Sequence, residues 1–79
     1  MKLITAEKDG DLVVRITGDI DHHSAPGIRE EIDRLLDEKK PAGLLMDLGQ
    51  TDFMDSSGLG LVMGRYQRMQ ELGGTLTVA

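Results

Sequence analysis

The sequence predicts an α/β domain in which a small mixed sheet of about four strands packs against two helices. Two observations predict this fold class: a strong hairpin signal lies near the N-terminus, and two strand–helix–strand patterns follow it along the chain. Successive units of that kind imply parallel strands joined by right-handed crossovers. We therefore expect a single domain over residues 1–79, with both helices on one face of the sheet.

The first two strands are expected to form an antiparallel hairpin. The segments Lys2–Ala6 and Leu12–Thr17 are rich in β-branched and apolar residues. Between them lies an Asp-Gly pair, Asp9 and Gly10, which is a strong signal for a tight hairpin turn. The segment Gly18–His23 that follows is polar and is predicted to be a loop.

A helix is predicted over about Ala25–Lys39. Ser24 is a suitable N-cap, and Pro26 is tolerated in the first turn, where backbone amides have no intrahelical partner. Pro41 ends the helix. The apolar residues recur at i, i+4, i+7 and i+8 and predict one buried face, made of Ile28, Ile32, Leu35 and Leu36.

The segment Leu44–Leu48 is predicted to be a strand inside the sheet. It is short and almost entirely apolar, which is typical of a strand that is covered on both faces. The stretch Gly49–Asp55 that follows it is expected to be a loop.

A second helix is predicted over about Ser57–Leu72, and it ends at Gly73 and Gly74. The last strand is expected at Thr75–Val78. Helical spacing predicts that the buried face of this helix consists of Leu59, Val62, Met63, Tyr66 and Met69.

The composition excludes several classes of function. The chain has 79 residues and no cysteine, so its core is modest and no disulfide reinforces it. Its net charge of −5 argues against binding to nucleic acid or to an anionic membrane. The longest uncharged stretch, Ser56–Gly64, is too short to span a membrane, and the N-terminal segment lacks the apolar core of a signal peptide. We expect a soluble, cytoplasmic protein that holds no cofactor.

Polar residues gather in two loops that are expected at the carboxyl edge of the sheet. Right-handed crossovers place Gly18–His23 and Gly49–Ser57 at the same edge, where ligands and partners usually meet open α/β sheets. Asp55 or Ser56 is predicted to cap the helix that follows, and capping without further function remains open from the residues alone. The candidate site residues are Asp19, Asp21, His22, His23, Asp52, Asp55, Ser56 and Ser57.

A glycine-rich run at the start of the second helix invites a dinucleotide-binding interpretation. The spacing of Gly58, Gly60 and Gly64 does not fit the fingerprint of such sites, because the third glycine comes one residue late. Gly60 and Gly64 share a helix face and are instead predicted to permit close packing of the helix on the sheet.

The two loops also contain the residue types of a hydrolase triad. Ser56 or Ser57 could be combined with His22 or His23 and with Asp21, but the nucleophile-elbow pattern is absent. The adjacent histidines are poor metal ligands, because adjacent side chains rarely converge on one ion. We therefore expect neither an enzyme nor a metal site.

Two sequence motifs, one in each polar loop, form a recognisable combination. The first is Thr51–Gly60, followed by Gly64-Arg65-Tyr66, and the second is Thr17–His23 at the end of a strand. Together they resemble the signature of the STAS family, the sulfate-transporter and anti-sigma-factor-antagonist domains. The resemblance covers about residues 11–78 and is greatest to antagonists of the sporulation sigma-factor switch in Gram-positive bacteria.

The resemblance implies a regulatory protein without catalysis of its own. In such antagonists the serine after the aspartate, here Ser56, is phosphorylated by the anti-sigma factor, which is a serine kinase, and a phosphatase resets the switch. The unphosphorylated form captures the anti-sigma factor and so frees a sigma factor. A STAS scaffold or interaction module without phosphorylation is the open alternative. The partner-binding residues implied by the resemblance are Asp21, His22, His23, Ser24, Asp55, Ser57, Gly58 and Leu59.

STAS domains of this type continue beyond the last strand with a helix, a strand and a final helix. The 79 residues contain no counterpart of these elements, so we expect a truncated domain. The side chains of Leu3, Val13, Leu45 and Val78 are then expected to be incompletely covered. Because an exposed strand edge recruits other strands, a homodimer or larger assembly is predicted at micromolar concentration.

Overall fold

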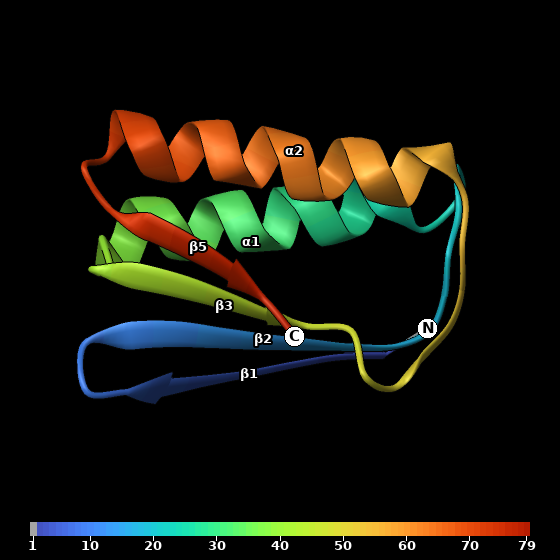
Figure 1. The fold of residues 1–79 in the computed structure, drawn as a ribbon, viewed down its shortest axis with the longest axis horizontal. Helices are drawn as coiled ribbons and strands as arrows, with labels where there is room; N and C mark the ends of the chain where they lie inside the picture. Colours follow the sequence, from blue (N-terminus) through green and yellow to red (C-terminus); the bar gives the residue numbers. More distant parts are fainter. Residues whose placement is uncertain (1) are drawn as a thin grey trace.

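The computed structural model describes residues 2–79, which form two layers, a sheet and a pair of helices (Figure 1). The elements are β1 (Lys2–Lys8), β2 (Asp11–Ile20), α1 (Ala25–Lys39), β3 (Gly43–Asp47), β4 (Thr51–Met54), α2 (Ser56–Glu71) and β5 (Thr75–Val78). Within these residues the strand order is β1-β2-β3-β5, and the short β4 pairs with β2. The β1–β2 pair is antiparallel and the other pairs are parallel, so the predicted α/β class with a mixed sheet is confirmed.

The predicted N-terminal hairpin is present. Lys8 lies opposite Asp11, so Asp9 and Gly10 alone form the turn between β1 and β2. Both turn residues have positive φ, 52° and 86°, as a two-residue type I′ turn requires. The twist of this turn matches the twist of the strands, and both strands are longer than predicted.

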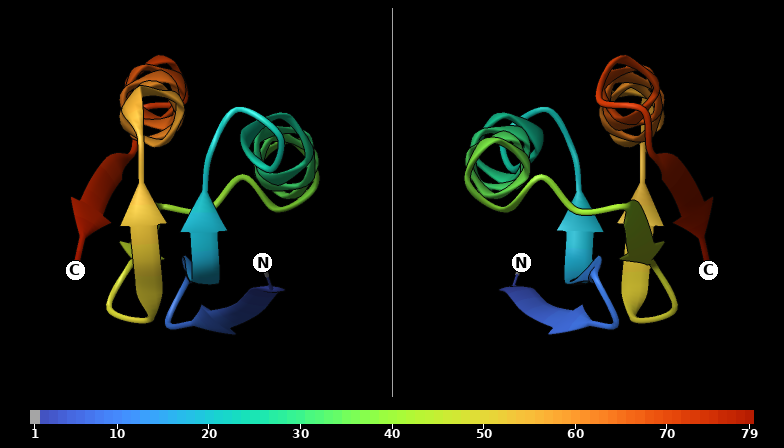
Figure 2. Two further views of the ribbon diagram at one scale, coloured as in Figure 1. Left: turned by 90° about the vertical axis from the view of Figure 1, so that its right-hand side faces the viewer. Right: turned by 90° about the vertical axis from the view of Figure 1, so that its left-hand side faces the viewer.

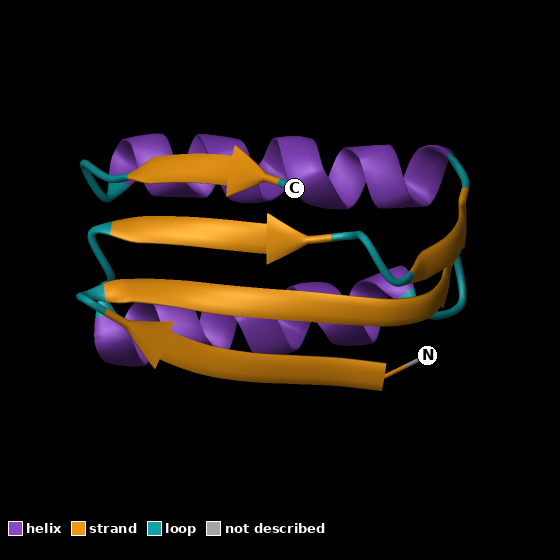
Figure 3. Cartoon of the chain, turned by 60° about the horizontal axis from the view of Figure 1, so that its bottom comes forward, coloured by secondary structure: helices purple, strands orange, loops and turns teal. Residues whose placement is uncertain are grey.

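Both helices lie on one face of the sheet, as predicted, and β3 lies between β2 and β5 (Figure 2 and Figure 3). The predicted covering of β3 on both faces is wrong. Its side chains alternate, so Leu44 and Met46 are buried beneath the helices, whereas Leu45 is only half-buried on the opposite face. That face also carries an ion pair, with 3.0 Å between Arg15 Nε and Asp47 Oδ2. The single layer of helices therefore leaves the other face of the sheet in contact with water.

The buried face predicted for α1 is confirmed. Ile28, Ile32 and Leu36 have exposed fractions of 1% or less, and Leu35 is also buried. These side chains join the inward-facing residues of β2 and β3 in one apolar core. Periodicity alone thus places α1 correctly on the sheet.

The buried face predicted for α2 is largely wrong. Of the predicted set only Met69 is fully buried, and Val62 is half-buried. Leu59, Met63 and Tyr66 are exposed, Met63 by 62%. Three large apolar side chains of this helix therefore face away from the core.

The helix α2 packs on the sheet through a different set of residues. Gly58, Leu61, Arg65 and Met69 are buried, at i, i+3, i+7 and i+11. A glycine and an arginine occupy two of these four positions, so apolar periodicity points to neighbouring residues instead. Neither helix within residues 2–79 is both long and apolar enough to cross a membrane.

The close packing predicted for Gly60 and Gly64 is also wrong. A Cβ atom at either position would meet nothing within 4 Å. Close approaches occur instead at Gly58 and at Gly74, where a Cβ would lie 2.6 Å from the backbone oxygen of Ala42. The second of these approaches fixes how the chain returns from α2 into β5.

The largest difference from the expected fold is a fifth strand among the described residues. Thr51–Met54, in the segment predicted to be a loop, form β4 parallel to the end of β2. Thr51 Oγ1 also donates to the backbone oxygen of Ile16 over 2.8 Å. Gly18, with φ of 89°, marks the place where the register shifts. Because β2 and β4 extend the sheet, both polar loops are shorter than predicted.

The expected gaps in the covering of the sheet are present. Leu3, Val13 and Leu45 are half-buried, and Val78 is exposed. Val13 and Leu45 are register partners on the face without helices, whereas Val78 lies at the edge strand β5. The sheet is thus least covered on its open face and at β5.

Candidate functional site

The pairing of β2 with β4 brings the two polar loops together at one edge of the sheet. Ile20 and Met54, the last residues of these strands, lie opposite each other. The next residues along the chain are Asp21 and Asp55, and the Asp55 amide donates to the Ile20 carbonyl over 3.2 Å. The expectation that both loops share the carboxyl edge is confirmed.

Asp21 organises the tight turn between β2 and α1. Its Oδ1 accepts hydrogen bonds from the backbone amides of His23 (2.9 Å) and Ser24 (3.0 Å). The amide of Ser24, and after it that of His23, lowers the pKa of the Asp21 carboxyl below its ordinary value. The carboxylate is therefore charged at neutral pH and held in a fixed orientation.

Ser24 does not cap α1 with its side chain, contrary to the prediction. Its hydroxyl accepts from the Asp21 amide and donates to the Asp19 carbonyl, each over 3.0 Å. The Ala25 amide is satisfied instead by the Asp21 carbonyl at 2.9 Å. Pro26 removes one first-turn amide that would otherwise need a partner, so α1 begins without a side-chain cap.

Asp55 is the N-cap of α2, which decides between the two capping residues that the sequence allowed. Its Oδ1 accepts from the Ser57 amide at 2.8 Å, and its carbonyl accepts from the Gly58 amide at 3.0 Å. Ser56 is the first residue of α2 and is exposed. Asp55 therefore caps the helix, and the adjacent Ser56 is exposed at the surface.

The start of α2 lies close to the ends of β2 and β4, and position 58 has no room for a Cβ atom while the Met54 side chain keeps its place. A Cβ atom on Gly58 would lie 2.0 Å from Met54 Cγ and 3.2 Å from Ile20 Cγ2. Real Cβ atoms do not approach carbon so closely, so a larger residue requires a shift of the Met54 side chain or of the helix. Gly58 thus allows α2, which begins at Ser56, to start close to the two strand ends.

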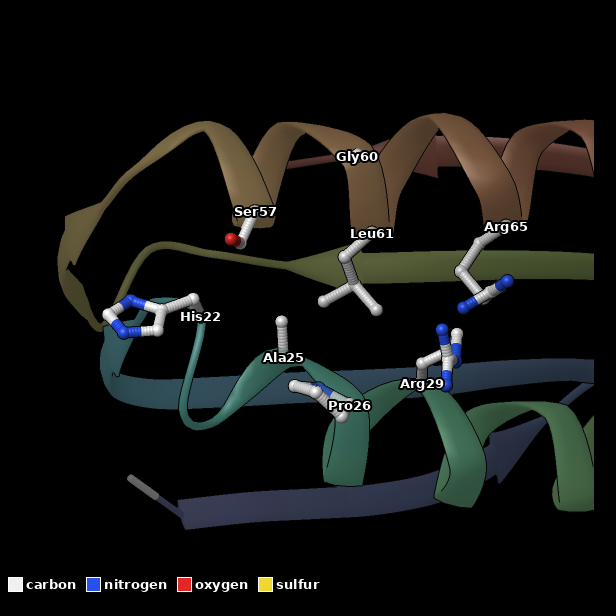
Figure 4. A pocket seen from close by; sticks show the side chains of 8 residues that line it. All are labelled: His22, Ala25, Pro26, Arg29, Ser57, Gly60, Leu61 and Arg65. Carbon is white, nitrogen blue, oxygen red and sulfur yellow. The ribbon is translucent and has the colours of Figure 1, made fainter.

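The two histidines lie next to each other, with ring centroids 4.0 Å apart. Asp21 binds backbone amides rather than an imidazole, and within residues 2–79 no hydrogen bond links a serine hydroxyl to a histidine ring. The triad drawn from the sequence is therefore not assembled. His22 and Ser57 instead line one end of a cavity between α1 and α2 (Figure 4).

Residues 2–79 of the chain match the family of proteins described as the STAS domain. The chain belongs to the STAS domain family. A curated relative, the anti-sigma F factor antagonist of Paenibacillus polymyxa, is 36% identical to it over 69 residues, which cover 87% of this chain and 59% of the relative. The anti-sigma-B factor antagonist of Bacillus subtilis is 36% identical over 70 residues, which cover 89% and 62%. This STAS domain therefore spans about three fifths of the length of these relatives.

Two solved structures have the same fold as this STAS domain. The anti-sigma factor antagonist SpoIIAA in its unphosphorylated form has a TM-score of 0.82 at 27% identity, covering 98% of this chain and 71% of that one. The Bacillus cell fate determinant SpoIIAA in the phosphorylated form has a TM-score of 0.79 at 28% identity, covering 95% and 68%. The predicted STAS fold is confirmed.

Three exposed apolar residues lie within three positions of Ser56 in the sequence, and two of them are not among the predicted site residues. Phe53 is 56% exposed, Leu59 54% and Met54 39%. The sequence predicts a polar loop at Phe53 and Met54, although two adjacent large apolar residues between aspartates are a signal for an exposed apolar site. Exposed apolar groups beside polar ones are typical of protein–protein contact surfaces.

The residues expected to bind a partner differ in how much they reach the surface. Among these residues and Ser56, the exposed ones are Ser56, His22, His23 and Leu59; the half-buried ones are Asp21, Ser24, Asp55 and Ser57; and Gly58 is buried. The half-buried and buried members shape the two turns through the hydrogen bonds and the close approach described above. The exposed members, with Phe53 and Met54, form the surface that another protein could touch. We call Ser56, His22, His23, Phe53, Met54 and Leu59 the edge surface.

Proposed function

We propose that this STAS domain is an anti-sigma-factor antagonist that is switched by phosphorylation of Ser56. In this proposal the edge surface binds an anti-sigma factor that is a serine kinase, and binding frees a sigma factor. The observation that carries the proposal is the β2–β4 pairing, because it sets the Asp21 turn beside the exposed Ser56. The curated relatives named as anti-sigma factor antagonists support the same conclusion.

The proposed switch is a phosphoryl transfer to Ser56. The kinase transfers the γ-phosphoryl group of ATP, so that a bond forms between phosphorus and Ser56 Oγ while the bond to the ADP oxygen breaks. The hydroxyl proton passes to a base of the kinase, and ADP leaves. A phosphatase reverses the modification by hydrolysis and releases inorganic phosphate. The domain itself supplies an exposed hydroxyl and no catalytic group.

Electrostatics favours a switch that acts at the interface rather than by refolding. A phosphate adds about −1.5 to −2 charges at neutral pH, and the N-terminus of α2 favours a negative charge. The side chain of Asp55 already accepts the hydrogen bond of the Ser57 amide. The charged Asp21 lies in the neighbouring turn at the same edge of the sheet. Attraction by the helix and repulsion by the two carboxylates therefore oppose each other. The added charge and bulk act mainly on the partner that covers Ser56.

The unphosphorylated edge surface suits a partner with an apolar centre. Phe53, Met54 and Leu59 provide apolar contact, and the exposed hydroxyl of Ser56 loses little on being covered if it finds a hydrogen-bond partner. A phosphate at that place must be stripped of water within an apolar surround, which is costly. Binding is therefore expected to be strong without the phosphate and weak with it.

The setting of this function is the bacterial cytoplasm, where sigma factors and their regulators act. The resemblance to antagonists of the sporulation switch supports a role in that process, which is part of the proposal. The proposal assigns the domain a purely regulatory role.

The test combines phosphorylation mapping with binding measurements. The domain is incubated with the anti-sigma kinase encoded in the same genome and ATP, and the modified residue is located by mass spectrometry. Ser56→Ala should abolish modification, and Ser57→Ala, one residue along the same helix, should leave it. Calorimetry should show that Ser56→Ala keeps the affinity for the kinase, whereas Ser56→Asp lowers it about a hundredfold, or about 3 kcal/mol.

The outcomes separate the proposal from its alternative. Binding to the partner without any modification of Ser56 would indicate a STAS scaffold or interaction module. Equal affinities of Ser56→Ala and Ser56→Asp would contradict the switch. Because aspartate imitates a phosphate only in part, the decisive comparison uses the domain with phosphoserine at position 56.

A further inference from the structure

A cavity between the N-terminal halves of α1 and α2 has a strongly basic side that the proposed function does not use. Its volume is about 260 Å³, just below the range of about 300–1,000 Å³ that is typical of pockets for drug-sized ligands. Arg29 of α1 and Arg65 of α2 point toward each other across it (Figure 4). Its polar lining is completed by His22 and Ser57. The space suits a small ligand that carries negative charge.

Arg65 is buried without enough partners to satisfy its guanidinium group. The residue is 8% exposed, and within residues 2–79 its Nε and Nη1 atoms have no hydrogen-bond partner. Its Nε lies 3.1 Å from Asp33 Oδ1 as an ion pair, but the two atoms are not aligned as a hydrogen bond. Buried polar groups are normally satisfied, so donors left over in a cavity wall indicate a missing acceptor.

The charges around Arg65 do not balance. Burial lowers the pKa of Arg65, Asp33 raises it, and the neighbouring guanidinium groups of Arg29 and Arg68 lower it. Arg68 already pairs with Asp37 on α1. Within residues 2–79 Arg65 forms an ion pair with Asp33 alone and Arg29 forms none, and both guanidinium groups line the cavity.

We infer that this cavity binds the phosphate group of a small phosphate ester, with Arg29 and Arg65 as its main ligands. Guanidinium groups present paired donors that match the oxygens of phosphate, and a phosphate between Arg29 and Arg65 can accept hydrogen bonds from both side chains at once. The hydroxyl of Ser57 and the ring of His22 provide further donors at the other end of the cavity. The walls between them are aliphatic, from Ala25 and Leu61, and fit a short carbon chain.

This site is independent of the phosphorylation of Ser56. Ser56 is exposed and does not line the cavity, whereas Ser57 does. A domain that is never phosphorylated would therefore still bind the ester. Conversely, the replacement of Arg29, which lines the cavity but is not part of the edge surface, should leave binding of the partner unchanged.

The experiment is a titration of the 79-residue protein, labelled with ¹⁵N, by NMR at constant ionic strength. The probes are inorganic phosphate, glycerol 3-phosphate and acetate. Both phosphates should cause saturable shifts of the Ser57 amide and of the arginine Nε–H signals, with dissociation constants in the millimolar range or below. Tighter binding of glycerol 3-phosphate assigns the site to an ester, and equal binding assigns it to the phosphate group alone.

The matched variants are Arg29→Gln and Arg34→Gln, two exposed positions of α1. Arg34 pairs with Glu31 and Glu38 away from the cavity, so its replacement should leave the affinity for phosphate unchanged. Arg29→Gln should lower that affinity at least tenfold while the remaining spectrum stays that of the folded domain. Shifts that do not saturate, equal affinities of the two variants, or equal binding of acetate would each overturn the inference.

Discussion

The two helices lie side by side on the same sheet, yet they use their apolar residues differently (Figure 2). On α1 all four residues of the predicted apolar face are buried. On α2 three of the five predicted residues, Leu59, Met63 and Tyr66, are exposed, and a charged residue, Arg65, is buried in the helix's inner face. The same spacing argument therefore succeeds for one helix and fails for the other.

The difference shows that an apolar pattern reports every apolar surface of a helix and not only its core face. The apolar residues predicted for α1 all belong to the one buried core. α2 carries apolar residues toward the edge surface, where Leu59 lies, and toward a groove beside β5 that is lined by Met63, Tyr66 and Leu76. Surplus apolar residues on a helix therefore indicate contacts beyond the core.

The largest expected effect compares one core position on α1 with one surface position on α2. Ile32→Ala removes a side chain with no exposed surface and should lower the free energy of unfolding by about 2–5 kcal/mol. Met63→Ala should change it by no more than about 0.5 kcal/mol, because Met63 is largely exposed. Urea unfolding at a protein concentration low enough to keep the domain monomeric measures both.

Ile32→Ala removes much of the stability of a small domain and could unfold it, so the experiment includes a second, milder substitution at the same position. Ile32→Val should cost about 0.5–1.5 kcal/mol and keep the domain folded. A cost for Met63→Ala as large as that for Ile32→Val would mean that the predicted apolar face of α2 is part of the core after all.

Most of the fold could be predicted because short-range signals and the core agree. The Asp9–Gly10 turn and the apolar face of α1 each depend on neighbouring residues only. The strand β4 could not be predicted, because Thr51–Met54 becomes a strand only when it pairs with the end of β2. Its partner residues are more than thirty positions away, and local patterning carries no information about that contact.

The candidate site could be predicted in its residues but not in their roles. The sequence predicts Ser56, Asp21 and Asp55 in two loops at one edge, and the structure confirms that the two loops meet there. The hydrogen bonds of Asp21 within its turn do not follow from the sequence, which points to Ser24 as the cap of α1. The burial of Arg65 could not be derived either, because a charged residue is normally assigned to the solvated face.

A smaller effect on the free energy of unfolding is expected from substitutions at two glycines in the first turns of α2, Gly58 and Gly60. Gly58→Ala places a Cβ atom against Met54 and Ile20 and should lower the free energy of unfolding by about 1–3 kcal/mol. Gly60→Ala meets open space inside a helix and should raise it by about 0.5–1 kcal/mol. Thermal unfolding followed by circular dichroism distinguishes the two signs. If both variants are stabilised, Met54 moves aside freely and α2 is not held against the strand ends.

The smallest expected effect concerns the groove between α2 and β5. Within residues 2–79 no strand pairs with the outer edge of β5, and this strand has no charged residue to discourage pairing. The other edge strand, β1, carries charged residues at both ends, Lys2 and Lys8 among them. We therefore expect a homodimer at micromolar concentration in which two copies of β5 pair and cover Met63 and Tyr66.

Matched lysine substitutions at the two edges test this dimer by sedimentation equilibrium. Val78→Lys on β5 and Ile4→Lys on β1 replace side chains of similar exposure, 46% and 42%, with the same charge. Val78→Lys should weaken the dimer about tenfold, because a charged residue on an edge strand discourages pairing with another strand, whereas Ile4→Lys should leave it unchanged. Equal weakening by both variants would place the contact elsewhere. A monomer at all concentrations, with a cooperative unfolding transition, would mean that the exposed apolar residues of α2 are tolerated in water without a second copy.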